Sequence, residues 1–320
     1  MDHVSVMLGA QLDGLGPLAQ AATLAEERDV RLWLGQSFQL DSHDALTALA
    51  GRGHHVRAGL AVAVAPLRTP FDAALRARGV AALSERPFSV AYGIGTASAA
   101  AALRGAPLER PGSWVRDYAR EVRALLDSDA AATGMAPYPL ASPPVEVGLG
   151  VLRPRMARLA GQVADFAVTW LAPTAYLADT VLPGLEQGAA EAGRRRPRLV
   201  SVVQAAVARP GRVAPRLAAI ACSTHLGLPH YQAMLRSAGV PIEGHPARDL
   251  RAAVGHGLFT YGSPADVAEV VAEHRRLGVD EVVVNVGAVA VEHGAAAAVA
   301  DLAEVLDACG AEASSGRDVA

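Results

Sequence analysis

The sequence predicts an α/β fold, the (β/α)₈ or TIM barrel, and two observations lead to that prediction. Short apolar runs alternate about eight times with alanine-rich amphipathic stretches along the 320 residues. Strands that alternate with helices require right-handed crossovers, and these build a parallel sheet whose functional residues lie at the C-terminal ends of its strands. The expected strands are Val4–Leu8, Arg31–Leu34, Arg57–Val64, Phe88–Gly93, Val145–Val147, Phe166–Leu171, Leu199–Ala206 and Glu281–Asn285.

The segments between these runs have apolar residues at helical spacing. Pro17–Arg28, for example, carries leucine or alanine at positions 18, 21, 22, 24 and 25. The Ser128–Pro144 stretch, rich in alanine, proline and serine, is typical of an exposed loop. The expected helices are Pro17–Arg28, Asp44–Arg52, Pro70–Leu83, Ser113–Leu126 and Arg153–Gln162.

The alternation breaks between about residues 212 and 257, which have a helical pattern and no strand. We expect a helical insertion after the seventh strand, placed where it can cover the barrel mouth. Gly262-Ser263-Pro264 then begins a last helix–strand–helix unit. Residues 1–310 are expected to form a single domain, and 311–320 a flexible tail.

Composition excludes several classes of protein. Hydrophobic residues make up 51% of the chain and charged residues 19%, as in a globular protein, and no apolar run is long enough to span a membrane. The net charge of −3 does not attract nucleic acid, and the basic run Arg194–Arg198 ends a helix, where arginines stay solvated. Two distant cysteines and no metal-binding spacing argue against disulfides and metal sites. We therefore expect a cytoplasmic protein without nucleic-acid or membrane partners.

Six segments, taken in order, carry a recognisable set of patterns. They are Ala25–Trp33 (AEERDVRLW), Asp44–Ala50 (DALTALA), Arg57–Pro70, Leu83–Gly95, Arg153–Gly161 (RPRMARLAG) and Tyr261–Val267 (YGSPADV). In these segments the chain resembles the luciferase-like monooxygenase superfamily of flavin- and deazaflavin-dependent barrels, and within it the branch that uses coenzyme F420. The resemblance covers nearly the whole chain.

The resemblance implies where a deazaflavin would bind. Its ring would lie against a non-prolyl cis peptide bond between Ala61 and Val62, and Thr96 and Ala97 would meet the ring and its phosphate-bearing tail. The N-terminus of the helix after the fifth strand also attracts phosphate, and Arg153 there can add a bidentate contact. The expected cofactor-binding residues are Gln36, Ala61, Val62, Val64, Thr96, Ala97, Gly148, Gly150, Val151, Leu152 and Arg153.

Two departures from the family pattern bear on the chemistry. Gln36-Ser37 stands where the family usually has an Asp-His pair, and Ser98 stands where the sugar-phosphate dehydrogenases of the branch have a glutamate. Oxidation of sugar phosphates is therefore excluded. Ser37 and Ser98 remain the candidate catalytic residues, as groups that can hold a carbonyl or a water. The expected substrate contacts are Phe38, Trp170, His225 and His230.

The function that the resemblance implies is an F420-dependent oxidoreductase. Hydride would pass between the deazaflavin and an electron-poor C=C or C=N bond of a small molecule or a modified peptide, as in natural-product biosynthesis. One alternative is an FMN-dependent luciferase-like monooxygenase, and another is a degenerate barrel without catalysis. The family also implies a homodimer.

Overall fold

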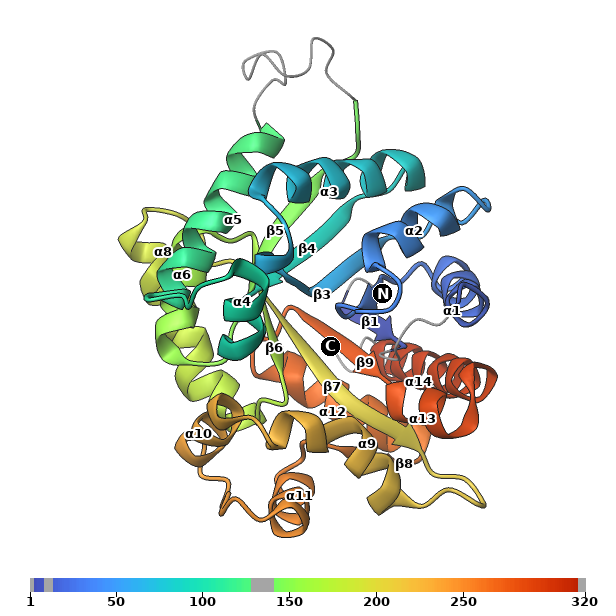
Figure 1. The fold of residues 1–320 in the computed structure, drawn as a ribbon. Coiled ribbons are helices and arrows are strands. Elements are labelled where there is room, and N and C mark those ends of the chain that lie inside the picture. Colours follow the sequence, from blue (N-terminus) through green and yellow to red (C-terminus); the bar gives the residue numbers. More distant parts are fainter. Residues whose placement is uncertain (1–2, 9–13, 128–140, 316–320) are drawn as a thin grey trace.

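Eight parallel strands close into a barrel, as predicted (Figure 1). The computed structural model describes residues 3–8, 14–127 and 141–315. Strands β1 to β7 pair in chain order, and β9 closes the ring between β7 and β1. The barrel strands are β1 (Val4–Met7), β2 (Leu32–Leu34), β3 (Ala58–Val64), β4 (Phe88–Gly93), β5 (Val145–Gly150), β6 (Phe166–Trp170), β7 (Arg198–Val207) and β9 (Glu281–Asn285).

Each of the eight expected runs overlaps one barrel strand, and β5 and β7 extend beyond the expected runs. One further strand, β8 (Thr260–Gly262), was not expected; it extends the sheet by pairing with Ala205–Val207 at the end of β7. Three residues are too few to show a strand period in the sequence.

Helices surround the barrel, and the five expected ones are α1, α2, α3, α5 and α6. The helix α14 continues through Ser315, into the stretch expected as a tail, and residues 316–320 lie outside the described residues. The same is true of 128–140 in the expected loop. The helices are α1 (Gly16–Glu27), α2 (Ser42–Ala50), α3 (Pro70–Ser84), α4 (Ala97–Arg104), α5 (Pro111–Asp127), α6 (Pro154–Val163), α7 (Thr174–Tyr176), α8 (Leu182–Glu191), α9 (Ala214–Leu226), α10 (Pro229–Ser237), α11 (Pro246–Gly255), α12 (Pro264–Arg276), α13 (Gly287–His293) and α14 (Ala295–Ser315).

The expected insertion is helical, as predicted. It consists of α9, α10 and α11, which lie between β7 and β8 in the chain and form the orange group beside β6 and β7 in Figure 1. Proline occupies the first turn of all three helices, where its missing N–H costs no hydrogen bond.

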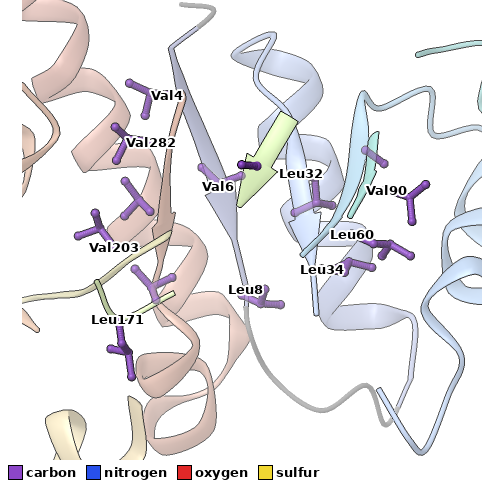
Figure 2. Close-up of a cluster of buried hydrophobic side chains, with 14 of the residues drawn as sticks. Val4, Val6, Leu8, Leu32, Leu34, Leu60, Val90, Leu171, Val203 and Val282 are labelled. Atoms are coloured by element: carbon purple, nitrogen blue, oxygen red, sulfur yellow. The ribbon is translucent and has the colours of Figure 1, made fainter. Parts of the chain in front are cut away.

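The hydrophobic core has two parts. The larger part lies between the barrel and the surrounding helices and includes the strand side chains drawn in Figure 2, such as Val6, Leu32 and Val203. The smaller part fills the barrel itself, around Trp33 and Phe166, whose rings meet edge to face with centroids 5.6 Å apart. Gly59 and Gly148 leave room for these two rings, since a Cβ on either glycine would lie 2.5 Å from ring carbons.

A buried ion-pair cluster closes the floor of the barrel, at the N-terminal ends of the strands. Glu281 is 1% exposed and accepts hydrogen bonds from Arg31 (2.5 Å), Arg198 (2.9 Å), Ser5 (2.5 Å) and the Trp33 indole (2.8 Å). Burial acts to raise the pKa of Glu281, but the two guanidinium groups and the hydrogen bonds outweigh it and lower that pKa. The floor therefore holds a buried carboxylate that two guanidinium groups neutralise.

Candidate functional site

The barrel mouth, at the C-terminal ends of the strands, has one half almost without side chains. Side chains alternate along a strand, so the residue two positions beyond an inward-facing one also faces inward. Trp33, Ala61 and Ala91 belong to the interior cluster, and the Cβ position of Gly148 faces Phe166 in that cluster. The inward positions at the mouth are accordingly Gly35 on the β2 end, Ala61 on β3, Gly93 on β4 and Gly150 on β5.

The expected non-prolyl cis peptide bond is present between Ala61 and Val62. The pairing of β3 with β4 shifts register there, between Leu60 and Ala63. Val62 lies across the ends of β4 and β5, since a Cβ on Gly93 would be 2.8 Å from its Cγ2 and one on Gly150 would be 3.1 Å from its Cγ1. The bulge therefore places Val62 over the glycine side of the mouth.

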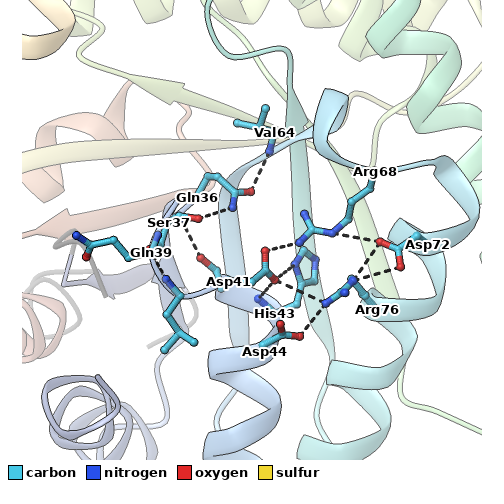
Figure 3. A network of polar contacts seen from close by, with 12 residues as sticks. Gln36, Ser37, Gln39, Asp41, His43, Asp44, Val64, Arg68, Asp72 and Arg76 are labelled. Carbon is cyan, nitrogen blue, oxygen red and sulfur yellow. Dashed lines mark hydrogen bonds and ion pairs between the residues drawn. The ribbon is translucent and has the colours of Figure 1, made fainter. Parts of the chain in front are cut away.

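Gln36 and Ser37, expected in the site, form the turn that follows β2 (Figure 3). The amide of Gln36 accepts a hydrogen bond from the backbone N–H of Val64 (3.3 Å) and donates one to the carbonyl of Ser37 (2.7 Å). The Ser37 hydroxyl, on a residue that is 5% exposed, accepts bonds from the backbone N–H groups of Gln39 (3.2 Å) and Leu40 (3.3 Å). The Gln36 side chain thus ties the turn after β2 to the end of β3, and the Ser37 side chain holds the turn itself.

An ion-pair network stands behind this turn (Figure 3). Asp41 caps α2 by accepting the backbone N–H of His43 (3.0 Å), and it pairs with Arg68 from the segment after β3. Burial acts to raise the pKa of Asp41, but hydrogen bonds from His43 and Arg68 hold it well below its usual range. Because Arg68 also contacts Asp72 (3.3 Å), the network ties α2 to α3 beside the mouth.

The segment after β4 begins a helix that was not expected, α4. Gly95 has a φ of +68°, and Thr96 caps the helix by accepting the backbone N–H of Ala99 (3.1 Å). The Ser98 hydroxyl lies 3.2 Å from that of Thr96, and Ala97 and Ser98 are exposed. The residues predicted here thus form a helix N-terminus at the mouth.

A second helix N-terminus follows β5. Gly150 ends the strand, and Val151 donates its N–H to the carbonyl of Val168 (2.8 Å). Arg153 is the N-cap residue of α6; its side chain makes no capping hydrogen bond and is exposed. The Tyr176 hydroxyl donates to the carbonyl of Leu152 (3.1 Å) and so fixes the loop. The predicted Gly148–Arg153 segment therefore offers backbone and one guanidinium next to the glycine half of the mouth.

An aromatic cluster joins the insertion to the opposite side of the mouth. Trp170, at the end of β6, packs on the interior cluster and lies 5.3 Å from the ring of His225 on α9. The ring centroid of Tyr231, on α10, lies 5.0 Å from the ring centroids of both His225 and His230. Burial, together with the nearby His230, lowers the pKa of His225 to about 4. Burial and the charge of Arg153 also lower the pKa of His230.

Three of the four predicted substrate residues, Trp170, His225 and His230, therefore come together in this cluster. Phe38 does not; its side chain is 67% exposed on the turn after β2. The structure also brings Arg153 close enough to His230 to affect its pKa, which no sequence pattern suggested.

A buried polar pair lies at the mouth that no sequence pattern predicts. Gln204 on β7 and Asn285 at the end of β9 are register partners, are 3% and 4% exposed, and are joined by a 3.0 Å hydrogen bond. Both sit in strands that the sequence presents as apolar runs, and 81 residues separate them. Only the folded sheet brings them together.

A recess of about 350 Å³ at the barrel floor is lined by Arg31, Arg57, Arg198 and the acidic residues Glu146, Asp280 and Glu281. It lies at the end of the barrel that carries stability rather than chemistry in this fold. Arg196, from the basic run, pairs there with Asp280 (2.9 Å).

The described part of the chain contains no cluster of metal-ligating side chains. Within the same residues, no helix is long and apolar enough to cross a membrane.

Comparison with known proteins gives one family and a set of similar folds. A family model described as luciferase-like monooxygenase matches residues 1–281. A search of curated proteins returned no match. The following solved structures share the fold.

An F420-dependent secondary alcohol dehydrogenase, in complex with an F420-acetone adduct, has a TM-score of 0.71 at 16% identity, covering 97% of this chain and 99% of that one. The coenzyme F420-dependent tetrahydromethanopterin reductase of Methanopyrus kandleri has a TM-score of 0.68 at 15% identity, covering 96% and 97%. The EDTA monooxygenase of Chelativorans sp. BNC1 has a TM-score of 0.67 at 15% identity, covering 93% of each chain.

Proposed function

The chain belongs to the luciferase-like monooxygenase family, and from that premise we propose that it is an oxidoreductase that uses coenzyme F420. The proposed reaction passes a hydride between the deazaflavin and an electron-poor C=C or C=N bond of a small molecule or modified peptide, in natural-product biosynthesis. We further propose that it works in the cytoplasm as a homodimer.

The observation that carries this proposal is the asymmetry of the mouth. At the mouth the inward positions on β2 to β5 are glycine or alanine, which leaves mainly backbone and the Val62 side chain facing a flat ring. On β6 and β7 the inward groups are larger, and two of them, the Trp170 indole and the Gln204 amide, have N–H groups with no hydrogen-bond partner among the described residues. A planar ring system with carbonyl groups is the kind of ligand that fits both halves.

Residues around the mouth would hold such a cofactor by different means. Val62 supports the ring from the β3 bulge, and Gln36 fixes the neighbouring strand end. The N-termini of α4 and α6 attract a phosphate through their backbone N–H groups, with Arg153 adding charge. When bound, the deazaflavin supplies two-electron hydride chemistry.

The aromatic cluster would form the substrate side. Burial lowers the pKa of both His225 and His230 and so favours their neutral forms, which can accept or donate a hydrogen bond without carrying charge. Trp170 and Tyr231 provide apolar walls. A neutral substrate fits this lining better than an anionic one.

FMN is the second candidate cofactor, since the EDTA monooxygenase fold and the family model are compatible with a flavin enzyme. Titration of the purified protein with F420 and, separately, with FMN, followed by cofactor fluorescence, decides between them. Binding of F420 in preference to FMN is expected. Binding of FMN alone would overturn the F420 proposal, and binding of neither would favour a barrel without catalysis.

Two variants test whether the ring lies over the glycine half of the mouth. Gly35→Leu is the test, and Gly35→Ala is its matched control. A Cβ at Gly35 has its nearest neighbour, the carbonyl of Ala61, at 4.0 Å, so the methyl group is tolerated. A leucine projects further into the mouth and is expected to abolish cofactor binding with little change in melting temperature. Equal binding by both variants would place the ring elsewhere.

A further inference from the structure

Two buried N–H donors at the mouth have no acceptor. The Nε2 atom of Gln204 and the Nε1 atom of Trp170 are buried, and neither has a hydrogen-bond partner in the part of the chain that the structure describes. A buried donor without an acceptor costs about 1–3 kcal/mol, and such groups are rare in folded proteins. Their presence at the mouth therefore points to a ligand.

A chain of hydrogen bonds determines which end of the Gln204 amide is left over. The Oδ1 atom of Asn285 accepts the backbone N–H of Gly287 (2.9 Å), so its Nδ2 faces Gln204. That Nδ2 donates to the Oε1 atom of Gln204 (3.0 Å). The Nε2 group of Gln204 must then point away from Asn285, as a donor held in a fixed direction.

The two donors lie on adjacent strands of the same face. Trp170 on β6 is the register partner of Val202 on β7, and both belong to or pack on the interior cluster. Gln204 is two residues further along β7, so it faces inward one step nearer the mouth. Neighbouring parallel strands lie about 5 Å apart and two residues along a strand add about 7 Å, so the Cα atoms of Trp170 and Gln204 lie about 8 Å apart, a span that two long side chains can cover to reach one small group.

We propose that Gln204, oriented by Asn285, and Trp170 form a two-donor subsite for a carbonyl oxygen. The amide Nε2 and the indole Nε1 both offer hydrogens, so the pair fits an oxygen with lone pairs. This rests on the proposed function: when hydride adds to the β-carbon of a conjugated C=C–C=O group, the π electrons move onto the carbonyl oxygen as an enolate, and a proton later adds to the α-carbon. Donors that are already in place stabilise that oxygen.

The carbonyl oxygen belongs either to such a substrate or to the cofactor's pyrimidinedione ring, and two measurements distinguish these sources. The first follows the indole N–H signals of cofactor-free protein by NMR during titration with cyclohexenone, with cyclohexene as the probe without a carbonyl. The chain has three tryptophans, and the Trp170 signal is assigned by its loss in Trp170→Phe. Trp33, whose indole is bonded to Glu281, serves as the internal control.

The second measurement is the dissociation constant of F420 and of FMN, followed by cofactor fluorescence. Both measurements compare the wild type with Gln204→Glu, which keeps an acceptor for Asn285 but replaces the free donor with an oxygen. Gln204→Met removes the donor without adding charge, and Gln20→Glu on the exposed face of α1 is the matched control.

We expect binding to weaken about tenfold in both Gln204 variants and not in the control. Weaker cofactor binding assigns the carbonyl to the cofactor, and weaker cyclohexenone binding alone assigns it to the substrate. Two results would overturn the proposal. One is unchanged binding of both cyclohexenone and the cofactor in the Gln204 variants; the other is no shift of the Trp170 signal together with unchanged cofactor affinity. Failure of the wild type to bind either cofactor would remove the proposed function, while the cyclohexenone titration would still decide on the subsite.

Discussion

The indole of Trp170 and the imidazole of His225 lie 5.3 Å apart, with their planes tilted by 38°. Trp170 ends a barrel strand, and His225 lies on the first helix of the insertion. This contact joins the insertion to the inward face of the barrel. A change in α9 therefore alters the side of the mouth where a substrate would lie.

Replacement of His225 with phenylalanine should change how stability depends on pH. The pKa of His225 is about 4 in the folded protein and about 6.5 in an unfolded chain. Between these values only the unfolded chain takes up the proton, so the wild type loses stability as pH falls through this window. His225→Phe keeps the ring contact and removes the titration.

Urea unfolding at about pH 7.5 and about pH 5 measures this effect, and we expect the wild type to lose about 1–2 kcal/mol more than the variant. The contributions of other histidines cancel in the difference. The same loss in both proteins would show that His225 titrates normally.

Replacement of Glu281 with alanine should destabilise the barrel strongly. It would leave Arg31 and Arg198 with only the part-exposed Glu146 as a shared carboxylate, and removing one partner of a buried pair costs about 3–5 kcal/mol. The control is Arg248→Ala, which breaks an exposed pair with Glu243 and should cost about 0–1 kcal/mol. Denaturant midpoints of the two variants that coincide would contradict the assigned role of the floor.

The close packing of α6 on α8 depends on glycine. A Cβ on Gly188 would overlap the backbone carbonyl of Arg158, which cannot move without shifting the helix. Gly188→Ala is therefore expected to lose about 2 kcal/mol or more. Gly79→Ala, on α3 with no atom near its Cβ position, should gain up to about 1 kcal/mol from helix propensity. Thermal unfolding of both variants tests the contrast, which would fail if Gly188→Ala melted like the wild type.

The guanidinium of Arg153 should contribute to binding of the phosphate-bearing cofactor. Arg153→Ala is expected to weaken binding about three- to tenfold, and less at high salt because the contact is exposed. The matched control is Arg155→Ala. Arg155 is the second residue of α6, and its side chain is also exposed. Fluorescence titration measures both. An equal loss in the two variants would indicate a general charge effect rather than a contact.

Much of the barrel can be predicted from sequence because each strand is a local apolar run. The helix α4 could not be predicted, since the side chains of its sequence ASAAAALR are almost uniformly small and form no clear apolar face. The Gln204–Asn285 pair could not either, because strand register between distant segments, not local pattern, places the two amides together. Ser37 was expected for its chemistry, yet two backbone N–H groups in its own turn already use its hydroxyl.

The charged floor has a consequence for how this barrel can change over time. Glu281 and its arginines hold the strands together at the end opposite the mouth. The aromatic residues of α9 and α10 contact the barrel at Trp170, at the C-terminal end of β6 and away from that cluster. Selection can therefore exchange residues of the insertion, and with them the molecules that the mouth accepts, while the scaffold keeps its margin against unfolding.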